Sequence, residues 1–178
     1  MKSLIIPVAG KSSRYPGMRP KWLLTMPDGK LMIEKSVSLI DIRKFKRIII
    51  IALNEHVKKF SEINVLKNVL KKNISKKIEL ILLKKETSCQ AETVMRGLEL
   101  AKVKGGFIIK DADNIFSQKI FKNNINQISV INSKKIDLLD AKSKSYISFD
   151  KLGKVINIVE KKVISDYFCC GAYEFKST

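Results

Sequence analysis

The chain alternates short, continuously apolar runs with longer segments in which apolar residues recur at helical spacing. Continuous apolar runs predict strands that are buried on both faces, and the amphipathic segments between them predict helices that cover those faces. We predict strands over residues 3–8, 47–53, 78–83 and 106–110, and helices over residues 31–42, 57–70 and 91–101. This alternation predicts an α/β fold, in which a mostly parallel sheet has helices on both faces.

The last third of the chain has a different pattern. Residues 146–149 and 155–159 flank the turn Asp150-Lys151-Leu152-Gly153, which predicts a hairpin, and residues 168–175 predict a further strand. Residues 123–144 are the most polar stretch and predict no clear element. Because we find neither a repeat nor a linker, we expect the 178 residues to form a single domain, large enough to bury a core.

The net charge of +18 raises the question of a nucleic-acid partner. Most of the positive charge is lysine spread over the whole chain, arginines are few, and aromatic residues make up only 7%. Proteins that read bases favour arginine and stacked aromatic side chains. We therefore expect a solvated lysine surface that attracts anionic substrates, and no nucleic-acid partner.

Two absences bear on the compartment. No apolar run approaches the ~18–20 residues that a membrane helix needs, and the N-terminus does not read as a secretory leader. The three cysteines, Cys89, Cys169 and Cys170, show neither metal-ligand spacing nor a disulfide framework. We expect a cytoplasmic protein that does not insert into a membrane.

The strand at 3–8 opens into a loop of small and basic residues, Ala9-Gly10-Lys11-Ser12-Ser13-Arg14, which Pro20-Lys21 follows. Gly10 permits a tight turn and leaves backbone N–H groups free to face an anion. Arg14 offers a planar fork of donors and Lys21 a mobile point charge, and both suit phosphate oxygens. The loop predicts a site for a nucleoside triphosphate.

A second chemical feature follows the strand at 106–110, where Asp111 and Asp113 lie one residue apart. In open α/β sheets, ligands bind beyond the carboxyl ends of the strands. One or two carboxylates, together with phosphate oxygens and water, suit Mg²⁺. An Asx-rich turn is the structural alternative, but the phosphate loop on the first strand favours a metal site.

Three other features could be either functional or structural. His56, the only histidine, follows a strand and fits a capping or surface position better than catalysis. Cys169 and Cys170 lie in a predicted strand, which favours buried thiols. Trp22 follows Lys21 directly and fits equally well as a stacking partner for a ligand or as packing that anchors the loop.

Together, these segments resemble the sugar-phosphate nucleotidylyltransferases, a family with a glycosyltransferase-A-like fold. The matching segments are 9–14 with 20–21, 89–93, 108–116, 153–161 and 171–173, which span nearly the whole chain. Ser12 stands where the family usually has a second glycine, and Lys162 where it usually has a proline. The resemblance implies a Rossmann-like, mixed and mostly parallel sheet, with a nucleotide-binding half over about 1–116 and an acceptor-binding half over about 117–178.

The resemblance also implies roles for individual residues. It places Arg14 and Lys21 in catalysis and Asp113 on Mg²⁺. The nucleotide-binding set that it implies is Ala9, Gly10, Lys11, Ser12, Ser13, Gln90, Thr93 and Asp111. The acceptor-binding set is Glu160, Lys161 and Gly171.

The implied reaction transfers a nucleoside monophosphate from a nucleoside triphosphate to a phosphorylated small molecule and releases pyrophosphate. The acceptor would be a sugar 1-phosphate or a similar precursor of capsule or lipopolysaccharide. A phosphomonoester has its second pKa near ~6, so the attacking oxygen is already ionised at pH 7 and no general base is required. A metal-dependent glycosyltransferase and a catalytically weak nucleotide-sugar binding protein are the alternatives, and the nucleobase, the acceptor and homo-oligomerisation stay open.

One expectation concerns the end of the sequence. The family has a second metal-binding aspartate well after the Gly171-Ala172-Tyr173 segment, and this sequence ends at Thr178. We therefore expect either a shortened member or a truncated product of a longer gene, with reduced activity, in which Mg²⁺ depends more on water and on the triphosphate.

Overall fold

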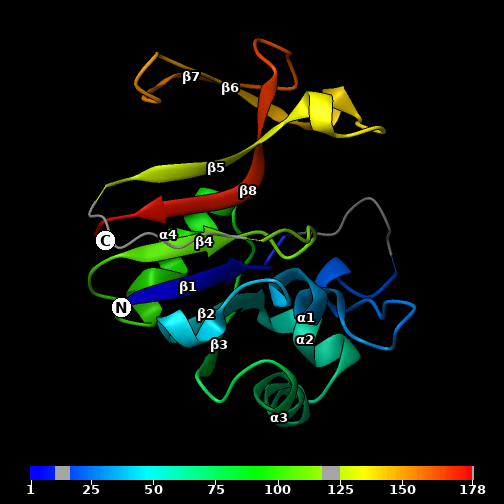
Figure 1. Ribbon diagram of the computed structural model, residues 1–178. Helices are drawn as coiled ribbons and strands as arrows, with labels where there is room; N and C mark the ends of the chain where they lie inside the picture. The colour runs from blue at the N-terminus through cyan, green and yellow to red at the C-terminus, as the bar shows by residue number, and fades with distance from the viewer. Residues whose placement is uncertain (11–16, 118–124, 178) are drawn as a thin grey trace. The chain divides into compact units, whose positions relative to one another are not determined.

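The computed structural model describes residues 1–10, 17–117 and 125–177 (Figure 1). The chain forms two compact units, Met1–Asn126 with Glu174–Thr178, and Gln127–Tyr173. No helix in the part of the chain that the structure describes is both long and apolar enough to cross a membrane.

The first unit is built on four parallel strands in the order β3-β2-β1-β4. Their bounds are β1 Lys2–Pro7, β2 Phe45–Leu53, β3 Ile78–Leu83 and β4 Phe107–Lys110. The two central strands are buried on both faces, since Leu4, Ile5 and Ile6 of β1 and all four isoleucines of β2 have no exposed surface. The predicted parallel sheet is therefore confirmed, and its four strands are the four that the apolar runs predicted.

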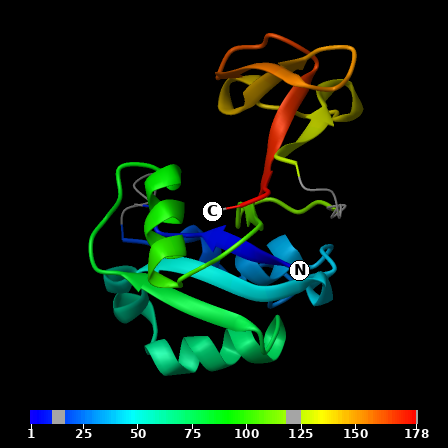
Figure 2. The ribbon, with the colours of Figure 1, turned by 90° about the vertical axis from the view of Figure 1, so that its left-hand side faces the viewer.

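Helices cover both faces of this sheet (Figure 2). One face packs against α1 Met32–Val37, α2 Asn54–Phe60 and α3 Ile63–Asn73, and the other against α4 Gln90–Leu100. Helix α4 approaches β2 closely at Gly97, where an added Cβ would lie 2.1 Å from Ile51 Cδ1. The single helix predicted over 31–42 is shorter than expected, because α1 ends at Val37 and a 3₁₀ turn at Ile42–Lys44 precedes β2.

The prediction of one helix over 57–70 is wrong, because the chain forms two helices there. Helix α2 ends at Phe60, Ser61 has an extended backbone (φ −160°, ψ 158°), and α3 begins at Ile63. The core explains the break. Val57, Leu66 and Leu70 are all buried in one cluster, yet at about 100° per residue a continuous helix would place Val57 and Leu66 on opposite sides.

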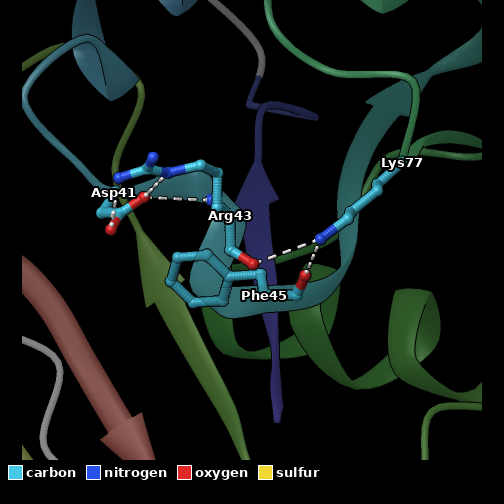
Figure 3. Close-up of polar contacts among 4 residues, drawn as sticks. All are labelled: Asp41, Arg43, Phe45 and Lys77. Carbon is cyan, nitrogen blue, oxygen red and sulfur yellow. Dashed lines mark hydrogen bonds and ion pairs between the residues drawn. The ribbon is translucent and has the colours of Figure 1, made fainter.

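A polar cluster fixes the entry to β2 at the amino edge of the sheet (Figure 3). The Asp41 carboxylate accepts hydrogen bonds from the backbone N–H and the side chain of Arg43. The Lys77 ammonium, just before β3, donates to the carbonyl oxygens of Arg43 (3.2 Å) and Phe45 (2.7 Å). These contacts join the starts of the neighbouring strands β2 and β3. The candidate site lies at the opposite, carboxyl edge of the sheet.

The second unit contains β5 Gln127–Asn132, β6 Ser145–Phe149, β7 Val155–Glu160 and β8 Tyr167–Phe175, whose last two residues belong to the first unit. Strand β6 lies between β7 and β8, and β5 pairs with β8. The predicted hairpin is confirmed: Gly153 has a φ of +79°, and Asp150 accepts hydrogen bonds from the N–H groups of Leu152 and Lys154, each at 2.9 Å. Strand β5 and the 3₁₀ turns Ser133–Lys135 and Ala141–Ser143 fall in the stretch for which the sequence predicted no element.

Candidate functional site

The end of β1 leads directly to the predicted phosphate loop. The Val8 N–H donates to the Ile51 carbonyl (2.8 Å), and Ala9 is buried in the core, so the loop leaves the sheet at a fixed point. Gly10 is exposed, and an added Cβ there would meet nothing within 4 Å. The predicted residues Lys11, Ser12, Ser13 and Arg14 lie outside the described residues, and their roles stay predictions.

Lys21 begins a 3₁₀ turn, Lys21–Leu23, that the core holds in place. Trp22 and Leu23 are only 3% and 4% exposed and pack in the main cluster under the sheet. Of the two roles considered for Trp22, the structure favours the anchor over a stacking partner. The two buried neighbours fix the backbone of Lys21 while its side chain stays half-exposed.

The Lys21 ammonium lies 2.9 Å from Asp113 Oδ2. Asp113 belongs to the loop that follows β4, so this ion pair joins the segment after β1 to the segment after β4. The sequence predicted a phosphate-binding role for the lysine and a metal-binding role for the carboxylate. The fold brings these two side chains into direct contact.

Gln90, the first residue of α4, reaches the same loop from the other side. Its amide Nε2 donates to Asp111 Oδ1 at 2.5 Å. Asp111 is partly buried, and this burial raises the pKa of its carboxyl above the usual value. The hydrogen bond from Gln90 and the charge of Lys110 act in the opposite direction. Three separated segments therefore converge at the carboxyl edge of the sheet, around two carboxylates.

Thr93, in the predicted nucleotide-binding set, faces the interior. It is 3% exposed, and its hydroxyl lies 2.5 Å from the Thr87 hydroxyl and 3.3 Å from the Cys89 carbonyl oxygen. These contacts close the turn that leads from β3 into α4. The position of Thr93 thus fixes where Gln90 starts the helix.

Sequence reasoning missed Lys110, the last residue of β4. This lysine has no exposed surface, and its ammonium donates to oxygens of the loop that carries both carboxylates. A signal was present in the sequence. Lys110 has the same in-out parity as Ile108, which is buried in the main core, so strand alternation places it inside.

The metal-ligand chemistry of this edge is limited to a few oxygens. Among residues 1–10, 17–117 and 125–177, no group of three or more His, Cys, Asp or Glu side chains could hold an ion. Asp111 and Asp113 supply carboxylate oxygens only, which are hard ligands. That set fits Mg²⁺, which is commonly bound through one or two carboxylates with substrate phosphates and water.

The predicted acceptor residues lie in the second unit. Glu160 ends β7, and its carboxylate lies 3.2 Å from the Lys161 ammonium. Lys161 has a φ of +60°, and its N–H donates to the Lys144 carbonyl (2.8 Å), which fixes this turn. Gly171 lies on β8, with β6 between it and β7. The unit therefore brings Glu160 and Lys161 together and places Gly171 two strands away.

His56 lies in the first turn of α2 and is partly buried. The N-cap of this helix is Leu53 and no side chain caps it, so the predicted capping or surface position of His56 is not found. Cys169 and Cys170 lie in β8 as expected, but only Cys170 is buried, whereas Cys169 is partly exposed. The Cys170 thiol donates to the Ser129 carbonyl oxygen (3.4 Å). Cys89 is exposed and precedes α4, where a hydrogen bond from the Glu92 N–H lowers the pKa of its thiol.

The fold of this chain is shared with nucleotide-sugar pyrophosphorylases and related nucleotidyltransferases of known structure. A nucleoside-diphosphate-sugar pyrophosphorylase from Vibrio cholerae RC9 is 25% identical to this chain, with a TM-score of 0.78 over 98% of this chain and 73% of its own. The inositol-1-phosphate CTP transferase from T. maritima is 16% identical, with a TM-score of 0.75 over 99% of this chain and 71% of its own.

A UDP-glucose pyrophosphorylase, solved in complex with UDP-glucose, has the same fold. It is 17% identical, with a TM-score of 0.72 over 99% of this chain and 76% of its own. No family model and no curated protein sequence matches this chain. The predicted resemblance is thus confirmed at the level of structure, where nearly the whole chain superposes on such enzymes.

Proposed function

We propose that this chain is a nucleotidylyltransferase, which transfers a nucleoside monophosphate from a nucleoside triphosphate to a phosphorylated small molecule. The observation that carries the proposal is the convergence of Lys21, Gln90, Asp111 and Asp113 at the carboxyl edge of the parallel sheet. Ligands of open α/β sheets bind at that edge. The neighbours that share the fold are named for this reaction class, which supports the same assignment.

In the proposed reaction, an oxygen of the acceptor phosphate attacks the α-phosphorus of the triphosphate. A new P–O bond forms, the bond from the α-phosphorus to the bridging oxygen of the β-phosphate breaks, and pyrophosphate leaves with the electron pair. Because the acceptor oxygen is ionised at neutral pH, the protein needs no base to remove a proton. Its task is to position the two substrates and to balance their charge.

Residues of both units would supply that positioning. Lys21 would hold phosphate oxygens, aided by the loop from Ala9 and Gly10 through Lys11, Ser12, Ser13 and Arg14. Gln90 would contact the nucleobase, and Thr93 would act by fixing the start of α4. The Glu160–Lys161 turn of the second unit would bind the acceptor and its phosphate, with Gly171 as the third acceptor residue.

Asp113, with Asp111 beside it, would hold Mg²⁺. When bound, the ion would neutralise charge on the α-phosphate. The ion pair supports this role, because Asp113 already faces a cation, the Lys21 ammonium. Since Lys21 would turn to the phosphates as the nucleotide enters, the carboxylate would exchange one cation for another and would not be left unpaired.

The decisive experiment measures pyrophosphate release. The four common nucleoside triphosphates would be combined with phosphorylated acceptors, among them glucose 1-phosphate and inositol 1-phosphate, because neighbours of this fold are named for such substrates. Release that requires both a triphosphate and an acceptor supports the proposal. Binding of a nucleotide sugar without turnover, or transfer of the sugar itself, would replace the proposal with a binding protein or a glycosyltransferase.

A further inference from the structure

The least expected side chain of the first unit is the ammonium of Lys110. The residue ends β4 and has no exposed surface. Its Nζ donates to the carbonyl oxygen of Asp111 at 2.7 Å, to the carbonyl oxygen of Asn114 at 2.9 Å, and to the Asn114 side-chain oxygen. The ring centroid of Phe116 lies 4.5 Å from the same nitrogen.

The Lys110 ammonium thus donates to three oxygen atoms and also faces the ring of Phe116. An ammonium buried without such partners is strongly unfavourable, whereas here the ammonium has oxygen acceptors and the ring adds a cation–π contact. All of these partners belong to one short segment, Asp111–Phe116. The Lys110 ammonium therefore contacts this loop at both its start and its end.

That loop carries both carboxylates of the candidate site. Asp111 receives a hydrogen bond from Gln90 and Asp113 an ion pair from Lys21, so their side chains have partners on the outside of the loop. Lys110 fixes the backbone of the same loop from the inside. A metal such as Mg²⁺ demands near-octahedral geometry and tolerates little displacement of its ligands.

We infer that Lys110 is a positioning residue for the metal-binding loop, and this inference rests on the proposed function for its catalytic consequence. The ammonium does not touch the substrates. It sets the backbone of residues 111–116, and with it the position of the Asp113 carboxylate that would hold the ion. Partners that orient metal ligands in this indirect way commonly change metal affinity or activity by about 10- to 100-fold when they are replaced.

The test replaces Lys110 by methionine, which keeps the apolar stem and removes the charge. In Lys110→Met, we expect amide hydrogen exchange over residues 111–116 to rise at least tenfold more than exchange over β1. We expect the Mg²⁺ concentration for half-maximal activity to rise about tenfold or more, while the nucleotide KM stays within about twofold. Asn114→Ala, which removes one acceptor, should change the same quantities in the same direction and by less.

A partly buried lysine, Lys2, provides the control. Lys2 pairs with Glu174 at the opposite end of the sheet from the loop. Lys2→Met should lower the melting temperature without changing exchange over 111–116 or the dependence on Mg²⁺. If it changes these quantities as much as Lys110→Met does, the effect is general destabilisation and the inference is overturned.

The other possible results also test the inference about Lys110. Unchanged exchange over 111–116 in a folded Lys110→Met protein overturns the inference, as does an unchanged Mg²⁺ dependence. If Lys110→Met does not fold, Asn114→Ala carries the test, and an Asn114→Ala protein with wild-type exchange and wild-type Mg²⁺ dependence overturns it. If the wild type transfers no nucleotide, the proposed function fails separately, because hydrogen exchange still reports on the loop.

Discussion

Lys21 and Asp113 lie 92 positions apart in the chain and form an ion pair of 2.9 Å. Both side chains are 46% exposed, so the pair contributes only about 0–1 kcal/mol to stability and opens readily. The ion pair instead neutralises the charges of Lys21 and Asp113 until, in the proposed reaction, the nucleotide binds. In the proposed reaction each partner finds a new opposite charge, a phosphate for the lysine and a cation for the carboxylate.

Replacing Lys21 by alanine should lower kcat roughly 10²- to 10³-fold, the usual loss when one preorganised charge is removed from a reacting centre. The melting temperature should change little, because the ion pair is exposed. Steady-state pyrophosphate release measures the effect. Lys35→Ala is the matched control, since Lys35 forms a similar pair with Asp28 at 2.8 Å on the surface. Near-wild-type turnover in the Lys21 variant would remove this lysine from the mechanism.

Replacing Asp113 by asparagine should abolish Mg²⁺-dependent turnover, and Asp111→Asn should reduce it less. An amide lacks the negative charge that attracts the ion, and the Asp111 carboxylate is more buried and already bonded to Gln90. Titration calorimetry of Mg²⁺ in the presence of nucleotide gives the affinity. Asp28→Asn is the control on a comparable exposed ion pair. Equal Mg²⁺ affinity in the Asp113 variant and the wild type would place the metal elsewhere.

Gly97→Ala should destabilise the fold, because the added Cβ would lie 2.1 Å from Cδ1 and 2.5 Å from Cγ1 of the fully buried Ile51. Overpacking of this kind costs about 1–3 kcal/mol. The higher helix propensity of alanine returns no more than about 1 kcal/mol, so the steric cost prevails. Unfolding in denaturant measures the difference. Met95→Ala, at an exposed position of the same helix, should change stability by less than about 0.5 kcal/mol, and a Gly97→Ala protein as stable as that control would contradict the packing.

The Arg47–Glu79 pair predicts a pH dependence of stability. Both guanidinium–carboxylate contacts are 2.6 Å, and the hydrogen bonds from Arg47 lower the pKa of Glu79 below 4.5. A lowered pKa stabilises the fold above the unfolded-state value of 4.5, and this stability is lost as the pH falls through the folded-state value. We therefore expect Glu79→Gln to lower stability at pH 7 and to have less effect at pH 3.

The magnitude at pH 7 should be about 0.5–1 kcal/mol, because the side chains are partly exposed and water screens the pair. Thermal unfolding of both proteins across this pH range measures it. Glu99→Gln, at an exposed position of α4, is the control and should follow the wild type. A difference between wild type and Glu79→Gln that grows toward pH 3 would contradict the assignment.

The sequence by itself determined the elements whose signals are local. The apolar runs predicted β1 to β4, and the Asp150–Gly153 turn predicted the β6–β7 hairpin, because burial on both faces and tight turns depend on neighbouring residues. The same patterns placed the loop that leads to Lys21 after the first strand, and Asp111 and Asp113 after the fourth, and so predicted a candidate site on one edge of the sheet.

Only the tertiary structure decided the relations between distant segments. It broke the helix predicted over 57–70, added β5, and paired Lys21 with Asp113 and Gln90 with Asp111. None of these is encoded within a local window, because each depends on which strands become neighbours and on which side chains then compete for the same space. The sequence therefore indicated which residues form the candidate site. Their contacts depend on the strand order β3-β2-β1-β4, which brings these residues together.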